Sequence, residues 1–154
     1  MIRPEQTILL AEDSPDDVLL TRLAFRKARL ANHLEVVQDG EEAIAYFKGM
    51  ERFADRERFP VPILLLLDLN MPKVSGFEFL LWFRKRRAFQ DLPVAILTSS
   101  EEDPHAAQAF KLGANSFLVK PPDASTLLAL VQRLHAGWKI VPGRELLESE
   151  RHSS

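Results

Sequence analysis

Five short apolar runs, separated by stretches of helical length, constrain the fold of this 154-residue chain more than any other feature of its sequence. The runs cover residues 8–11, 36–37, 63–67, 94–97 and 117–119. They are continuously apolar and do not alternate with polar residues, which is typical of parallel strands that helices cover on both faces. The sequence therefore predicts five buried parallel strands.

Helical patterns fill the intervals between these runs. They cover about residues 15–29, 41–48, 76–86, 104–112 and 123–137. The last is the clearest, because Leu127, Leu130, Val131, Leu134 and Trp138 form one apolar stripe at helical spacing. Ser14 and Ser75 are typical helix-start residues, and Gly113 is a typical helix stop. Strands and helices that alternate in this way predict a doubly wound α/β fold with helices on both faces of one parallel sheet.

Two segments lie outside this alternation. Residues 49–62 form a charged connection that is longer than the usual loop of about 4–6 residues. Residues 139–154 form a polar tail that is too short for a second domain. We therefore expect one domain over residues 1–138, followed by a tail without an output domain. The basic run at residues 84–87 ends a helix, where cations interact favourably with the helix dipole.

Composition and charge exclude several classes of protein. The 20 Lys and Arg residues and 22 Asp and Glu residues give a net charge of −2, so there is no basic field to hold nucleic acid or an anionic membrane. The absence of cysteine excludes disulfides, thiolate metal sites and cysteine nucleophiles. No apolar run is long enough to span a membrane, and the amino-terminal residues lack the apolar core of a signal peptide. We expect a soluble, cytoplasmic protein.

Residues that carry chemistry follow four of the apolar runs. In an open parallel sheet, ligands bind beyond the carboxyl ends of the strands. These positions hold Glu12 and Asp13, Asp68, Thr98 and Ser99, and Lys120 with Pro121. Three carboxylates that lie close together repel one another unless a cation sits among them. Oxygen ligands without His or Cys suit Mg²⁺, with Mn²⁺ as the alternative, so the sequence predicts a divalent metal.

The combination of these residues resembles the receiver domain of a two-component response regulator. The resemblance rests on Glu12-Asp13, the segment LLLLDLNMP at residues 64–72, Gly76, Thr98-Ser99 and Lys120-Pro121. It covers about residues 7–138 and implies a flavodoxin-like sheet with strand order 2-1-3-4-5. It also implies a phosphoprotein that signals through protein contacts and assists its own phosphorylation and dephosphorylation, and that is not an enzyme with a separate substrate.

The resemblance assigns a role to each residue of the expected site. Asp68 is the expected phosphate acceptor, with a histidine kinase as the donor. Glu12, Asp13, Asp68 and a backbone carbonyl of Asn70 are the expected metal ligands. The hydroxyl of Thr98 is expected to hydrogen-bond the phosphoryl group.

Lys120 is expected to pair with the phosphoryl group, and its bond to Pro121 is expected to be a cis peptide. Phe117 is expected to act with Thr98 as a switch, and a plain role in the core is an equal alternative.

A resemblance to one subfamily indicates which type of kinase is the phosphoryl donor. The start LLAEDSPDD, residues 36–47, the long charged loop and the DLNMP motif resemble single-domain regulators paired with phytochrome-type histidine kinases. Hybrid or chemotaxis kinases are alternative donors.

Two enzyme classes are alternative interpretations of these residues. A haloacid-dehalogenase-type phosphatase also uses a strand-end Asp with Mg²⁺, but it normally has a second Asp where this sequence has Asn70. A Ser-His-Asp triad lacks a base, because His33, His105, His135 and His152 fall on predicted helix or tail surfaces.

We also expect a homodimer that uses the fourth helix, the fifth strand and the fifth helix. Leu128 lies beyond the core stripe of the fifth helix, and Trp138, Ile140 and Val141 extend the apolar surface past its end. Such a surface is either packed on its own domain or covered by a partner.

Overall fold

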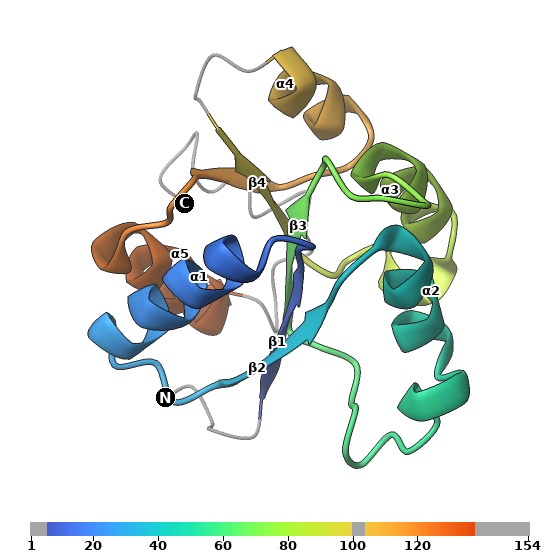
Figure 1. Cartoon of the computed structure of the whole chain (residues 1–154), viewed down its shortest axis with the longest axis horizontal. Helices are drawn as coiled ribbons and strands as arrows, with labels where there is room; N and C mark the ends of the chain where they lie inside the picture. Colours follow the sequence, from blue (N-terminus) through green and yellow to red (C-terminus); the bar gives the residue numbers. More distant parts are fainter. Residues whose placement is uncertain (1–5, 100–103, 138–154) are drawn as a thin grey trace.

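The computed structural model describes residues 6–99 and 104–137, and it contains one five-stranded, all-parallel sheet (Figure 1). The strands are β1 (Thr7–Ala11), β2 (His33–Val37), β3 (Leu64–Asp68), β4 (Val94–Thr98) and β5 (Ser116–Val119). Their order in the sheet is β2-β1-β3-β4-β5. The five strands, their parallel pairing and the flavodoxin-like order are therefore confirmed.

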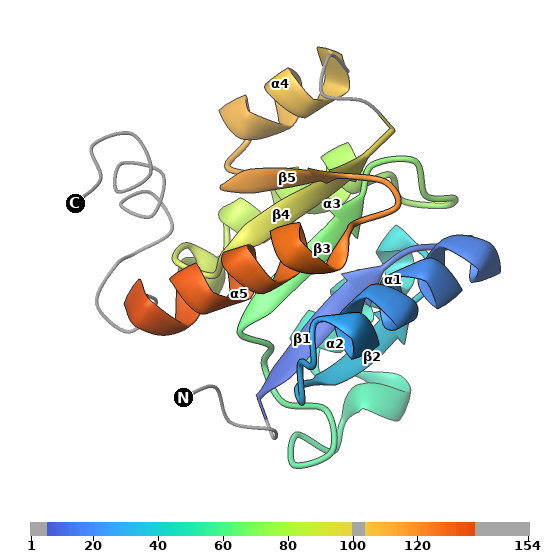
Figure 2. The same cartoon turned by 90° about the vertical axis from the view of Figure 1, so that its left-hand side faces the viewer.

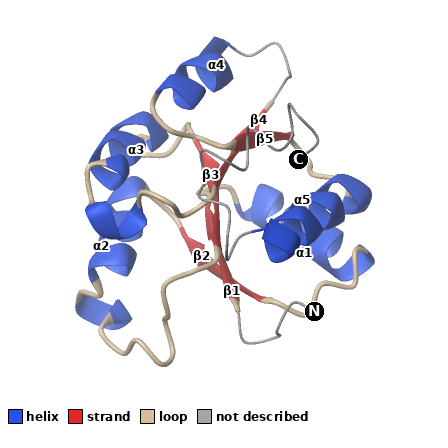
Figure 3. Ribbon diagram, turned by 180° about the vertical axis from the view of Figure 1, so that it is seen from behind, coloured by secondary structure: helices blue, strands red, loops and turns tan. Residues whose placement is uncertain are grey.

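Helices cover both faces of the sheet. They are α1 (Pro15–Lys27), α2 (Gly40–Lys48), α3 (Gly76–Arg84), α4 (Pro104–Lys111) and α5 (Ala124–Gly137). Figure 2 shows α1 and α5 side by side on one face. Figure 3 shows α2, α3 and α4 on the opposite face. The predicted doubly wound architecture is confirmed, and each face of the sheet has its own apolar core.

The residues at the helix boundaries act as the sequence predicts. The Oγ atom of Ser14 accepts a hydrogen bond from the backbone N–H of Asp17 and caps α1. Ser75 caps α3 and forms a reciprocal capping box with Glu78. Gly113 has a φ of 110°, and a Cβ atom there would come within 2.7 Å of Arg84. This position therefore requires glycine.

β2 begins earlier than the apolar run at residues 36–37 predicts. The strand starts at His33, so the expectation that this histidine lies on a helix or tail surface is wrong. β2 is an edge strand of the sheet, in which His33 is exposed, Leu34 and Val37 are buried, and Glu35 and Val36 are partly buried. Because His33 and Glu35 are polar, the apolar run is shorter than the strand itself.

The charged connection at residues 49–62 is packed against the domain. It contains the short 3₁₀ helix η1 (Glu51–Phe53) and buries Phe53 and Phe59 against Tyr46. The hydroxyl of Tyr46 donates to the carbonyl of Pro60 at 2.8 Å, and Arg56 donates to the carbonyl of Tyr46 at 2.7 Å. The segment thus extends the core that lies beneath α2.

Arg84 forms tertiary hydrogen bonds in addition to its place at the end of a helix. Its guanidinium donates to the carbonyls of Gly113, Phe89 and Gln90, and to the side-chain oxygen of Asn115 at 3.0 Å. The same Asn115 oxygen accepts the backbone N–H of Val94 at 2.8 Å. Arg84 therefore ties the end of α3 to the turn between α4 and β5, whereas residues 85–87 are exposed.

The described part of the chain holds no helix that is long and apolar enough to cross a membrane. In the apolar stripe of α5, Leu127, Leu130 and Val131 are buried as predicted. The side chains of Leu134 and Trp138 lie outside the part that the structure describes.

Candidate functional site

The sheet brings the predicted residues together at the carboxyl ends of four strands. Asp68 is the last residue of β3 and Thr98 the last of β4, while Glu12 and Lys120 directly follow β1 and β5. The parallel registers align these ends, since Ala11 pairs with Leu67 and Asp68 pairs with Leu97. Residues far apart in the chain therefore meet at one edge of the sheet.

Three carboxylates form the centre of this site. Glu12 and Asp68 are buried, and Asp13 is exposed. One oxygen from each of the three lies within 4.8 Å of the others. The backbone N–H of Asn70, whose side chain is exposed, donates to Asp68 Oδ1 at 3.0 Å. The backbone N–H of Ser14 donates to Glu12 Oε2 at 3.3 Å.

The ammonium of Lys120 lies among these carboxylates. Its Nζ atom is 2.8 Å from Glu12 Oε1, 3.1 Å from Asp68 Oδ2 and 3.1 Å from Asp17 Oδ2. The backbone N–H of Lys120 donates to the carbonyl of Thr98 at 2.7 Å, and the Lys120–Pro121 peptide bond is cis. The ammonium supplies part of the positive charge that close carboxylates need.

Burial and charge shift the pKa values of two of these groups. Burial, together with the neighbouring Asp68, raises the pKa of Glu12 to about 7. Burial alone would lower the pKa of Lys120, but its contacts with Glu12 and Asp68 outweigh this and raise the pKa above its ordinary value. Lys120 is therefore protonated at neutral pH, whereas the carboxyl of Glu12 is only partly ionised.

The donor set fits a hard divalent cation. Glu12, Asp13 and Asp68 present only oxygen atoms, which Mg²⁺ and similar ions prefer. Glu12 Oε1 is buried and close to the ammonium of Lys120, but it has no hydrogen-bond donor in suitable geometry. A cation that binds these three carboxylates would satisfy this oxygen and reduce their mutual repulsion.

Thr98 and Phe117 belong to β4 and β5, the two strands that follow β3 in the sheet. Thr98 is buried at the end of β4. Phe117 lies within β5, where it is half-buried and packs edge-to-face on Phe110 of α4 with the ring centroids 6.1 Å apart. Ser99 is exposed beside Thr98, and Ser100 lies outside the described residues.

Asp17 is a part of the site that the sequence analysis missed. It lies in the first turn of α1, where acidic residues commonly stabilise the helix dipole, so its position gave no sign of a further role. The sequence holds one weak signal, which is that α1 begins two residues after Asp13 and so keeps its first turn close to the acidic pair.

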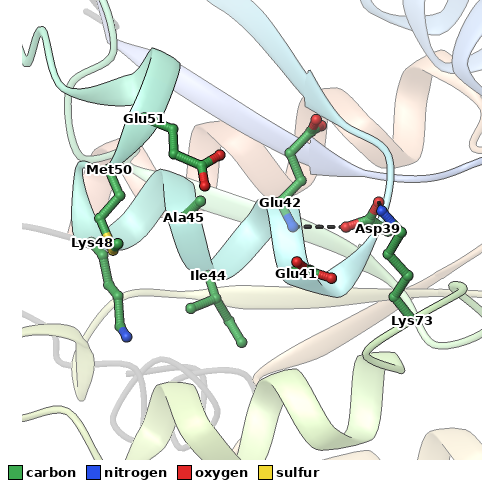
Figure 4. A pocket seen from close by; sticks show the side chains of 9 residues that line it. All are labelled: Asp39, Glu41, Glu42, Ile44, Ala45, Lys48, Met50, Glu51 and Lys73. Atoms are coloured by element: carbon green, nitrogen blue, oxygen red, sulfur yellow. Dashed lines mark hydrogen bonds and ion pairs between the residues drawn. The ribbon is translucent and has the colours of Figure 1, made fainter.

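A surface hollow beside α2 is a separate feature (Figure 4). It has a volume of about 320 Å³, and its lining includes Asp39, Glu42, Lys48 and Lys73. Lys73 pairs with Asp39 at 3.6 Å, and the backbone N–H of Glu42 donates to Asp39 at 2.7 Å. Two of its charged groups, Asp39 and Lys73, are thus paired with each other, and its lining contains none of the three clustered carboxylates.

The raised pKa of Glu12 predicts that Mg²⁺ affinity depends on pH. Below a pH of about 7 a proton occupies Glu12 and competes with the metal, so affinity should be about tenfold weaker near pH 6 than near pH 8. Calorimetric titration with Mg²⁺ measures this difference. The variant Glu12→Gln should bind Mg²⁺ more weakly, and its affinity should no longer differ between the two pH values. An equally large difference between the two pH values in the variant would show that another group causes the pH dependence.

Comparisons with known proteins agree with this arrangement. The family model described as the response regulator receiver domain matches residues 8–132. The response regulator Rcp1 of Synechocystis sp. is 30% identical over 135 residues, which cover 88% of this chain and 90% of Rcp1. These matches give no support to a haloacid-dehalogenase-type phosphatase.

Solved structures show the same fold. The bacteriophytochrome response regulator RtBRR is 36% identical with a TM-score of 0.75, and the match covers 83% of this chain and 76% of RtBRR. The Mn²⁺-bound form of Rcp1 is 30% identical with a TM-score of 0.67, and the match covers 86% of this chain and 94% of Rcp1. The chain is therefore a response regulator receiver domain and belongs to that family.

Proposed function

We propose that Asp68 accepts a phosphoryl group from a phosphorylated histidine of a histidine kinase, in a reaction that requires Mg²⁺. A carboxylate oxygen of Asp68 forms the new O–P bond as the N–P bond to the histidine breaks, and the imidazole leaves with the electron pair of that bond. The observation that carries this proposal is the ammonium of Lys120 at 3.1 Å from Asp68 Oδ2, because it places a fixed positive charge beside the acceptor.

Each neighbouring residue has a role in this reaction. Glu12, Asp13, Asp68 and a backbone carbonyl of Asn70 would hold Mg²⁺, with Mn²⁺ as the alternative ion. When bound, the metal would neutralise charge on the phosphoryl oxygens. The hydroxyl of Thr98 donates a hydrogen bond to the phosphoryl group. By positioning these groups, the protein assists its own phosphorylation and dephosphorylation without acting on a separate substrate.

Lys120 pairs its charge with a phosphoryl oxygen in the same reaction. Phe117, which packs on Phe110 of α4, supports a switch in which a change at Thr98 reaches the surface formed by β5 and α4.

The similarity to RtBRR supports a phytochrome-type histidine kinase as the donor. We further propose that residues 1–138 act as a single-domain regulator with a short tail at 139–154, and that output runs through protein contacts without nucleic acid. Histidine kinases draw their phosphoryl group from ATP, which makes the cytoplasm the expected location.

An apolar surface on α1 supports the docking of a protein donor next to the site. Leu19, Leu20 and Leu23 are between 38% and 56% exposed. Leu20 and Leu23 line a hollow of about 270 Å³ with Pro121, which follows Lys120 in the chain. An exposed apolar patch of this kind marks a contact surface.

The first test concerns the acceptor. Incubation with acetyl phosphate and Mg²⁺ should add one phosphate to the protein, and intact-protein mass measurement detects this adduct. The variant Asp68→Asn should show none, and EDTA should strongly reduce the adduct in the unaltered protein. The variant Asp16→Asn, which changes an exposed carboxylate nearby, serves as the control. An adduct that persists in Asp68→Asn would refute the assignment.

The second test concerns the leucines of α1. The double variant Leu19→Glu, Leu23→Glu should lower the rate of phosphotransfer from the kinase by about tenfold or more, because it places charges in an apolar contact. Labelling by acetyl phosphate should stay unchanged, since that donor needs no protein surface. Leu81→Glu on α3 is the matched control, because Leu81 is 46% exposed on the other face of the sheet. Equal losses in all variants would contradict docking on α1.

We also propose a homodimer through α4, β5 and α5. β5 is an edge strand of the sheet, and Leu128 of α5 is half-buried. Trp138, Ile140 and Val141, which complete the expected surface, lie outside the described residues. Light scattering at micromolar concentration should give the mass of two chains, and Leu128→Glu with Val141→Glu should halve it. The mass of one chain, with and without phosphodonor, would contradict dimerisation.

A further inference from the structure

Three carboxylates contact Lys120, and Asp17 differs from the other two. Glu12 and Asp68 belong to the oxygen cluster that fits a divalent metal. Asp17 contacts the ammonium at 3.1 Å from α1 and is not part of that cluster. Its side chain is 35% exposed, whereas those of Glu12 and Asp68 are 1% and 6% exposed. Asp17 therefore lies on the solvent side of the ammonium.

The backbone of Asp17 is held in place by the first turns of α1. Its N–H donates to the Oγ atom of the capping residue Ser14 at 3.3 Å. Its carbonyl accepts a hydrogen bond from the hydroxyl of buried Thr21 at 2.9 Å. The carboxylate thus projects from a well-fixed point, which is what a residue needs if it is to position a long, flexible side chain.

A divalent metal and the ammonium of Lys120 compete for the same oxygens. The ammonium lies 2.8 Å from Glu12 Oε1 and 3.1 Å from Asp68 Oδ2, in the cluster that the metal would occupy. Two positive charges at such short range repel each other. When the metal binds, the ammonium must move away from it, and Asp17 is the contacting carboxylate that lies outside the metal cluster.

We propose that Asp17 is a positioning residue that holds the Lys120 ammonium at the rim of the pocket when the metal is bound. Both positive charges would then be available to one phosphoryl group. The part of this proposal that concerns the phosphoryl group rests on the proposed function. The competition between metal and ammonium does not, and it is measured without any phosphodonor.

The test compares Mg²⁺ affinities of matched variants by calorimetric titration. Asp17→Asn should bind Mg²⁺ about tenfold more weakly, because the ammonium loses its alternative partner and stays in the metal cluster. Asp16→Asn removes the same charge from the adjacent, exposed position and should change the affinity by less than about twofold. Asp17→Glu keeps the charge and should recover most of the affinity. Equal losses in Asp17→Asn and Asp16→Asn would overturn the proposal.

A double-mutant cycle shows whether Asp17 acts through Lys120. Lys120→Met should raise the affinity for Mg²⁺, because it removes the competing ammonium. In that background Asp17→Asn should change the affinity no more than Asp16→Asn does. A loss from Asp17→Asn of the same size with and without Lys120 would overturn the proposal, since Asp17 would then act on the metal directly.

A direct readout on the ammonium completes the test and does not depend on variant stability. The ¹⁵N resonance of the Lys120 Nζ atom should shift on addition of Mg²⁺ to the unaltered protein and should remain sharp, because the group moves to a defined partner. In Asp17→Asn the same addition should broaden it. A resonance that Mg²⁺ leaves unchanged in the unaltered protein would overturn the proposal. Failure of the proposed phosphorylation would instead appear in the acetyl phosphate experiment alone.

Discussion

The balance of charge around Lys120 is the constraint on which the site depends. The parallel sheet places Glu12 and Asp68 at the ends of neighbouring strands, and Asp13 follows directly, so three carboxylates lie with oxygens within 4.8 Å of one another. Such a group is stable only with positive charge beside it. One such charge is the ammonium of Lys120, which follows β5, the strand next to β4 at the edge of the sheet. One ammonium does not balance three carboxylates, and a divalent cation bound by their oxygens would reduce the remaining repulsion.

The fold was predictable because its three central strands, β1, β3 and β4, are buried at every position. Continuous apolar runs mark β1, β3, β4 and β5 closely, and the capping residues Ser14 and Ser75 mark the starts of α1 and α3. The start of β2 was not predicted because its first three residues include the polar residues His33 and Glu35, which interrupt the apolar run. The positions of Glu12 and Asp68 followed from the strand ends alone, whereas the roles of Asn70 and Phe117 came only from resemblance to a family.

Interactions between distant segments account for what the sequence did not reveal. The contact of Asp17 with Lys120 joins residues 103 positions apart, and it depends on how α1 lies beside the end of β5. The hydrogen bonds from Arg84 to Gly113 and Asn115 likewise depend on the meeting of two turns. A run of basic or acidic residues looks the same in a sequence whether its side chains are solvated or engaged in tertiary contacts.

A structure of the protein with Mg²⁺ and beryllofluoride, a mimic of the phosphoryl group, tests the central claim most directly. The account predicts the mimic on Asp68, the metal on oxygens of Glu12, Asp13 and Asp68, and the ammonium of Lys120 between the mimic and Asp17. A metal bound elsewhere, or an ammonium that remains on Glu12 and leaves Asp17, would contradict it.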